Sequence, residues 1–130
     1  QPAFQPTEQL NILPQLDLTS VTERVIEEYN LSPQQAALGE QWYRMFLSLH
    51  QSHTDTVIAP PALADKWWHE HITQTRKYFA DCEALFGEYL HHNVDQDEVT
   101  AQRAKKNATE LYQSEFGEDI SNTLMANCNG

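Results

Sequence analysis

Signals that begin and end helices divide most of the 130-residue sequence into amphipathic segments joined by short connections. Ser32 is followed by a proline and a reciprocal glutamine, a combination that satisfies free amides at the start of a helix. Gly87 and Gly117 stand where two other segments end. Apolar residues recur at helical spacing between these signals, whereas only residues 56–58 resemble a strand. The pattern predicts an all-α fold.

The same signals predict a compact bundle of about four helices with short connections. A capping box formed by Ser20 and Glu23 begins the first helix, and two adjacent prolines open the third. The predicted helices span residues 20–29, 33–50, 61–86 and 98–116.

The two ends of the chain have a different character from the predicted bundle. Residues 1–16 contain three prolines and predict an extended arm, whose leucines and isoleucine can pin it to the helices. Residues 118–130 show little pattern and predict a mobile tail. Residues 17–117 are therefore expected to form a single helical domain.

Eight basic residues against nineteen acidic ones give a net charge of −11, which disfavours nucleic-acid binding because phosphate neutralisation needs clustered lysine and arginine. No apolar run reaches the length of a membrane span, so no membrane association is expected. Two cysteines do not form a disulfide framework, and a reducing compartment, the cytoplasm, is expected. A protein this acidic suits a metal ion or a basic peptide or protein partner.

All six histidines fall between residues 50 and 92, and such uneven placement of imidazoles is typical of a metal site. His69 and His71 are two residues apart, about 200° around a helix, so one ion cannot easily bind both. Asp65 precedes His69 by one turn, and such a carboxylate can fix the tautomer of the imidazole. The candidate metal ligands are Asp65, His69, His71, Cys82, His91 and His92.

Distance along the third predicted helix separates these candidates into two groups. His71 and Cys82 are eleven residues apart, about 16 Å on a straight helix, so they cannot share an ion. One group contains His69 and His71, with His50 and His53 from the preceding helix end. The other contains Cys82, His91 and His92, with Cys128 if the tail folds back. Zinc suits mixed imidazole and thiolate ligands best, followed by iron or copper.

Simpler interpretations compete with each ligand assignment. His50 and His53 are most simply surface or loop-capping residues. His69 is equally well explained as a core histidine satisfied by Asp65 or by a backbone carbonyl. Cys82, on an apolar helix face, is more often a small buried residue than a nucleophile.

Residues 65–92 carry an aspartate, Trp-His-x-His, a tyrosine, a cysteine and a glycine in that order. These positions are Asp65, Trp68, His69, His71, Tyr78, Cys82 and Gly87, followed by His91 and His92. The segment resembles the core motif of the glycine-rich domain-containing protein-like family, in its small bacterial members. The resemblance implies that His69, His71, Cys82 and His92 act as a unit, and it implies no particular reaction. The sequence departs from the family after His92.

Three functions fit these observations. The first is a small metal-binding helical domain that uses the histidine, aspartate and cysteine candidates. The second is an acidic protein-interaction module without catalytic activity. The third is a thiol-dependent enzyme in which Cys82 pairs with His91 or His92. Whether the protein is an enzyme is left open by the sequence.

Overall fold

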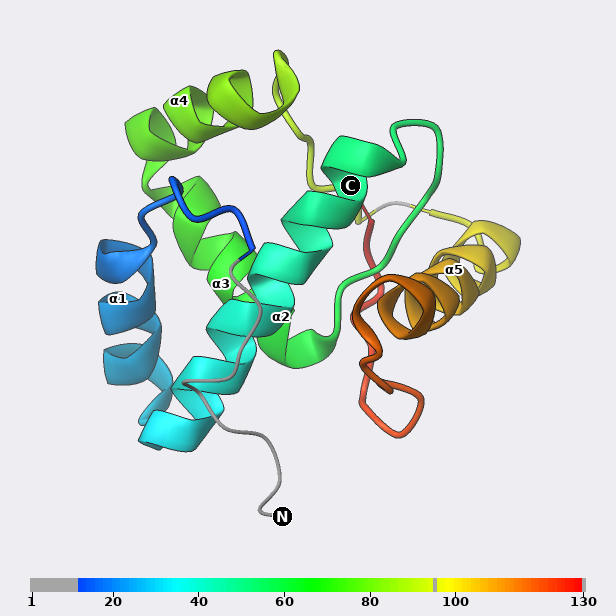
Figure 1. The fold of residues 1–130 in the computed structure, drawn as a ribbon, viewed down its shortest axis with the longest axis horizontal. Coiled ribbons are helices and arrows are strands. Elements are labelled where there is room, and N and C mark those ends of the chain that lie inside the picture. The colour runs from blue at the N-terminus through cyan, green and yellow to red at the C-terminus, as the bar shows by residue number, and fades with distance from the viewer. Residues whose placement is uncertain (1–11, 95, 130) are drawn as a thin grey trace.

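The computed structural model describes residues 12–94 and 96–129, and these residues form an all-α fold (Figure 1). The helices are α1 (Thr19–Tyr29), α2 (Pro33–Ser52), α3 (Ala62–Thr73), α4 (Thr75–Phe86) and α5 (Glu98–Phe116). The predicted helical class is confirmed, but the described residues contain five helices rather than about four. Among these helices, none has the length and apolar character needed to cross a membrane.

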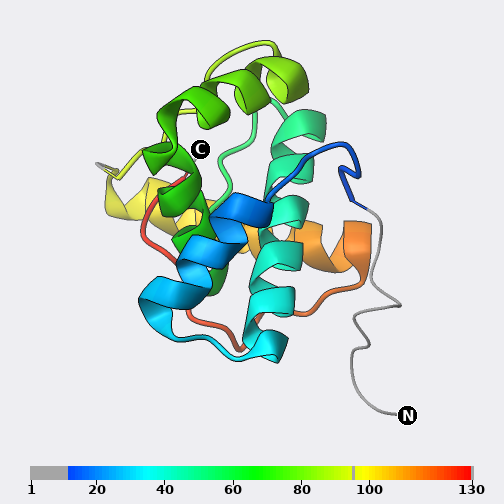
Figure 2. The same ribbon diagram turned by 90° about the vertical axis from the view of Figure 1, so that its left-hand side faces the viewer.

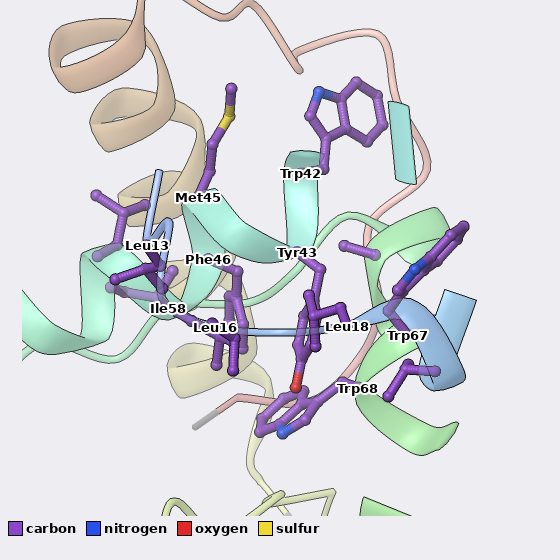
Figure 3. Packing of buried hydrophobic residues seen from close by; sticks show 14 of the residues in the cluster. Leu13, Leu16, Leu18, Trp42, Tyr43, Met45, Phe46, Ile58, Trp67 and Trp68 are labelled. Carbon is purple, nitrogen blue, oxygen red and sulfur yellow. The ribbon is translucent and has the colours of Figure 1, made fainter. Parts of the chain in front are cut away.

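Helix α2 is the centre of the packing and contacts α1, α3 and α5 (Figures 1 and 2). Figure 3 shows aromatic side chains of α2 and α3 meeting in the core. Tyr43 and Phe46 from α2, and Trp67 and Trp68 from α3, are all fully buried. Burial of large aromatic side chains supplies much of the free energy of a small core, so this contact anchors the fold.

Gly39 allows α2 and α3 to approach closely. A Cβ atom at this position would lie 2.2 Å from Cζ3 of the Trp67 ring. The indole Nε1 of Trp67 donates a hydrogen bond to Thr22 Oγ1 (2.8 Å), and the Thr22 hydroxyl donates to Glu40 Oε1 (2.6 Å). One buried indole therefore joins α1, α2 and α3.

The prediction of one continuous helix over residues 61–86 is wrong, because the chain turns at Gln74 between α3 and α4. His71 Nε2 lies 2.8 Å from Asp81 Oδ2, and Trp68 Nε1 donates to the Tyr78 hydroxyl at 2.9 Å. Each pair is ten residues apart, about 15 Å on a straight helix. These two hydrogen bonds can form only because the helix is broken.

The helix boundaries test the predicted capping signals. The capping box at Ser32 is confirmed, and Gly87 and Gly117 end their helices in the left-handed conformation. The box predicted at Ser20 is wrong, because α1 begins at Thr19 and the Ser20 hydroxyl donates to Gln74 Oε1 instead. Ser20 therefore lies inside α1 and bonds a side chain at the turn between α3 and α4 instead of capping its own helix.

The C-terminal segment packs onto the body, contrary to the predicted mobile tail. Ile120 is fully buried, and Met125 pairs with Pro61 at the start of α3. Asn129 pairs with Asn93 through two reciprocal backbone hydrogen bonds of 2.8 and 2.9 Å. These long-range backbone contacts have no periodic signal in the sequence.

The predicted extended arm falls partly outside the described residues, which begin at Ile12. Leu13 and Leu16 are buried against the body, as expected for apolar residues that anchor this segment. Arg44 Nη1 donates to the Leu13 carbonyl oxygen (2.9 Å) and fixes the segment over α2.

Replacement of Gly39 by alanine should destabilise the protein by about 1–3 kcal/mol, because the new methyl group collides with the Trp67 ring. Urea unfolding followed by circular dichroism measures this change. The exposed Gln34→Ala, in the same helix, is the control and should leave the free energy of unfolding within about 0.5 kcal/mol of the wild type. Equal stability of both variants would contradict the close approach of α2 and α3.

Candidate metal centre

Asp65, in the first turn of α3, is the centre of a cluster of potential metal ligands. Its Oδ2 lies 3.1 Å from His69 Nε2, one helical turn later. Its Oδ1 lies 3.1 Å from Nε2 of His92, which follows α4 in the chain. The two imidazoles also meet each other, with 3.0 Å between their Nε2 atoms. Both oxygens of one carboxylate thus face histidine nitrogens.

The C-terminal segment adds a thiol to this cluster. Cys128 Sγ lies 3.4 Å from Asp65 Oδ1. Adjacent residues of extended backbone point to opposite faces, so pairing of Asn93 with Asn129 sends the neighbouring His92 and Cys128 to the same face. One ligand atom from each of Asp65, His92 and Cys128 lies within 4.8 Å of the other two. The backbone pairing therefore explains how a distant cysteine reaches α3.

The cluster lies at the edge of the core and is partly shielded from solvent. The Trp68 ring packs against the His92 ring with 4.1 Å between centroids. Side-chain exposure is 12% for His92 and 16% for Asp65, and Cys128 is buried, whereas the His69 side chain is 58% exposed. His69 is therefore the outermost of the four groups.

Charges at the cluster favour an ionised aspartate and a protonated thiol. Burial opposes ionisation of Asp65, but the hydrogen bond from His92 and the charge of His69 outweigh it and lower the pKa of this carboxyl. Burial, with the adjacent carboxylate, raises the pKa of the Cys128 thiol well above its usual value. A bound cation reverses the second effect, because a coordinating thiol loses its proton.

The distances within the cluster are close to those of a zinc site. Neighbouring ligand atoms in tetrahedral zinc are about 3.3–3.6 Å apart, from Zn–N and Zn–O distances of about 2.0–2.1 Å and a Zn–S distance of about 2.3 Å. The contacts that Asp65, His69 and His92 make with one another are 3.0–3.1 Å, and Cys128 lies 3.4 Å from Asp65. His69 meets Oδ2 of Asp65 whereas His92 and Cys128 face Oδ1, so His69 has to move to complete a tetrahedron around one ion. Each imidazole carries at most one proton on Nε2, so two protons cannot satisfy all of these contacts, whereas one central cation can.

His71 is placed away from this cluster, in a second polar network. The Tyr43 hydroxyl lies 2.8 Å from His71 Nδ1, and Asp81 lies 2.8 Å from Nε2. Burial lowers the pKa of His71, although Asp81 opposes this effect. Both ring nitrogens are engaged, so His71 acts here as a buried histidine that joins α2, α3 and α4.

Cys82 and His91 also lie outside the four-residue cluster. Cys82 is buried on α4, and burial raises the pKa of its thiol, which disfavours a nucleophilic thiolate. The exposed His91 stacks edge-to-face against Tyr89, with 4.9 Å between ring centroids. Of the six predicted ligands, the structure brings together Asp65, His69 and His92.

His50 is buried, which contradicts a surface position, one of the two alternatives (surface or loop-capping) expected for this residue. The residue is only 7% exposed, its ring packs edge-to-face on Phe46, and its Nε2 carries no hydrogen bond. Burial lowers the pKa of His50 to about 4. His53, by contrast, lies near the surface with its Nε2 3.2 Å from Glu115 Oε2. The two histidines therefore differ although they are close in sequence.

A comparison with known protein families shows to which family this chain belongs. One family model, UCP032817-like, matches residues 9–115. The chain belongs to this UCP032817-like family. The match covers Asp65, His69 and His92 but ends before Cys128, so the thiol of the cluster lies outside the UCP032817-like region. No curated protein and no solved structure matches the sequence.

This finding corrects the family resemblance drawn from residues 65–92. The matching family is the uncharacterised UCP032817-like family, and no glycine-rich domain family is indicated. A motif of single residues separated by variable gaps is a weak discriminator between helical families, because buried tryptophan, histidine and cysteine also serve packing.

The free energy of unfolding should decrease as the pH is lowered, because His50 is held neutral in the fold. Its folded pKa of about 4 lies below the unfolded value near 6.5, so the unfolded chain binds the proton first as pH falls. Between pH 7 and pH 4.5 this group should remove about 2–3 kcal/mol from the free energy of unfolding.

Urea unfolding of wild type, His50→Phe and His53→Phe at both pH values isolates the His50 contribution. On acidification, the free energy of unfolding should decrease by about 2–3 kcal/mol more in the wild type and in His53→Phe than in His50→Phe. Identical pH dependence in all three proteins would show that His50 is not buried as a neutral imidazole.

Proposed function

We propose that the protein binds one zinc ion through Asp65, His92, Cys128 and His69. The observation that carries this proposal is the convergence of Asp65, His92 and Cys128 from three separate chain segments, with one ligand atom of each within 4.8 Å of the other two. His69 Nε2 lies beside this group, 3.0 Å from His92 Nε2 and 3.1 Å from Asp65 Oδ2. Each of these groups loses part of its hydration in the cluster, and a shared cation would offset that cost.

The donor set favours zinc over other cations. Two imidazole nitrogens, one thiolate and one carboxylate oxygen give the four ligands of a tetrahedral site. Calcium and magnesium prefer six or more oxygen ligands, which this cluster does not provide. Iron and copper accept imidazole and thiolate and are the next candidates.

The proposed role of the ion is structural. With four protein ligands the coordination sphere is closed, as in zinc sites that stabilise a fold rather than activate water. Zinc would join three parts of the chain. These are α3, which carries Asp65 and His69, the segment after α4, which carries His92, and the C-terminal segment, which carries Cys128. Cys128 must stay reduced to serve as a thiolate, so the proposal includes a reducing compartment, the expected cytoplasm.

Protein purified without a histidine tag should contain or take up one zinc ion per chain, measured by elemental analysis and by calorimetric titration of metal-free protein. Free zinc at about a hundred times Kd should raise Tm by about 10 °C. Cobalt(II) should replace zinc and show the visible bands of tetrahedral coordination and a near-ultraviolet thiolate charge-transfer band.

Matched variants test which side chains bind the ion. Cys128→Ser and His92→Ala should each weaken zinc binding by at least about 100-fold, and Cys128→Ser should abolish the charge-transfer band. Cys82→Ser and His91→Ala are the controls, since these residues lie outside the cluster, and should bind zinc as the wild type does. Zinc stoichiometry near zero, or equal loss in Cys82→Ser, would refute the proposed site.

A further inference from the structure

His69 differs from the other three proposed zinc ligands in how it meets the cluster. Its side chain is 58% exposed, whereas that of His92 is 12% exposed and Cys128 is buried. It approaches Asp65 through Oδ2, whereas His92 and Cys128 face Oδ1. His69 is therefore both the most accessible of the four ligands and the one that has to move to reach a shared ion.

His92 and Cys128 are fixed by contacts outside the cluster. The His92 ring packs on the fully buried Trp68, with 4.1 Å between ring centroids. The backbone pair of Asn93 with Asn129 sets the positions of the two residues that precede them, His92 and Cys128. Neither ligand can withdraw from the ion without disturbing core packing or this backbone pair.

The His69 ring has a looser attachment. In the part of the chain that the structure describes, its polar and ring contacts are with Asp65 and His92, which belong to the cluster itself. Histidine on a helix has two common χ1 rotamers, so rotation about one bond can carry an exposed ring into solvent while the backbone stays in place. The ring regains its hydration when it leaves, which limits the cost of the movement.

Release of His69 leaves the cross-link between segments intact. Asp65 and His69 both lie on α3, one turn apart, so His69 joins no further segment to the ion. Asp65, His92 and Cys128 come from three separate segments and are enough to hold them together. Zinc sites with three protein ligands carry an external molecule at the fourth position. The ion can therefore keep its structural role while its fourth ligand exchanges.

We infer that His69 is an exchangeable zinc ligand, and that a small neutral nitrogen base can replace it at the exposed side of the ion. The inference rests on the proposed zinc site. In the exchange, the coordinate bond from His69 Nε2 to zinc breaks and one from the incoming nitrogen forms, with no change in oxidation state and no proton transferred.

Charge favours a neutral ligand at this position. Zinc bound by one thiolate, one carboxylate and neutral imidazole has no net charge. An anionic ligand would add a negative charge to a chain whose net charge is already −11, whereas a neutral base adds none.

Imidazole at pH 8 is the probe, added to zinc-loaded wild-type protein labelled with 15N in its histidine rings. Saturable addition should move the His69 Nε2 chemical shift to that of a metal-free ring, while His92 Nε2 keeps its metal-bound shift. Azide, an anion, should need a concentration at least about tenfold higher for the same change. An unchanged His69 shift, loss of both metal-bound shifts together, or tighter binding of azide than of imidazole would overturn the inference.

His69→Ala and His92→Ala remove the same ring from the two histidine positions. His69→Ala should still bind one zinc ion, with a loss of affinity at least about tenfold smaller than the loss in His92→Ala. With cobalt(II), His69→Ala should keep the thiolate charge-transfer band, and imidazole should shift its visible bands saturably. His91→Ala removes an exposed histidine outside the cluster and is the control, whose cobalt(II) spectrum should match that of the wild type.

The outcomes separate the exchange from the zinc site itself. Zinc bound by the wild type, with equal losses of affinity in His69→Ala and His92→Ala, would overturn the exchange and leave the site in place. Absence of bound zinc in the wild type would overturn both.

Discussion

The contact between α2 and α3 is the interaction on which the rest of the structure depends. The Trp67 ring lies against the backbone of Gly39, and neither helix could approach this closely with a larger residue there. This approach places Phe46 against the Trp68 ring, with 4.7 Å between centroids. Trp68 in turn supports His92, so the position of the candidate metal site follows from the packing of two helices.

Local signals predict most of the helices because each signal acts within one turn. The capping box at Ser32 and the glycines at 87 and 117 depend only on neighbouring backbone groups, and they are found where expected. The break at Gln74 has no such signal, since no proline or glycine is near it. It is stabilised by the His71–Asp81 and Trp68–Tyr78 hydrogen bonds, which are tertiary contacts.

Only the part of the candidate site that depends on local spacing can be predicted from the sequence. The Asp65–His69 pair is one helical turn apart and can be found from spacing alone. The thiol of Cys128 reaches Asp65 because the C-terminal segment pairs with distant backbone, Asn129 with Asn93 and Met125 with Pro61. Isolated backbone pairs of this kind leave no hydrophobic periodicity in the sequence, so folding back of the tail cannot be derived locally.

The spacing of the two histidines of α3 determines which polar cluster each of them joins. His69 and His71, about 200° apart on the helix, face different surroundings. His69 points to Asp65 and His92 at the exposed edge, whereas His71 is enclosed between Tyr43 and Asp81. Had the second histidine stood four residues after the first, both would have faced one side and competed for the same partners. The two-residue offset therefore lets one short helix support a candidate metal site and a buried hydrogen-bond network at once.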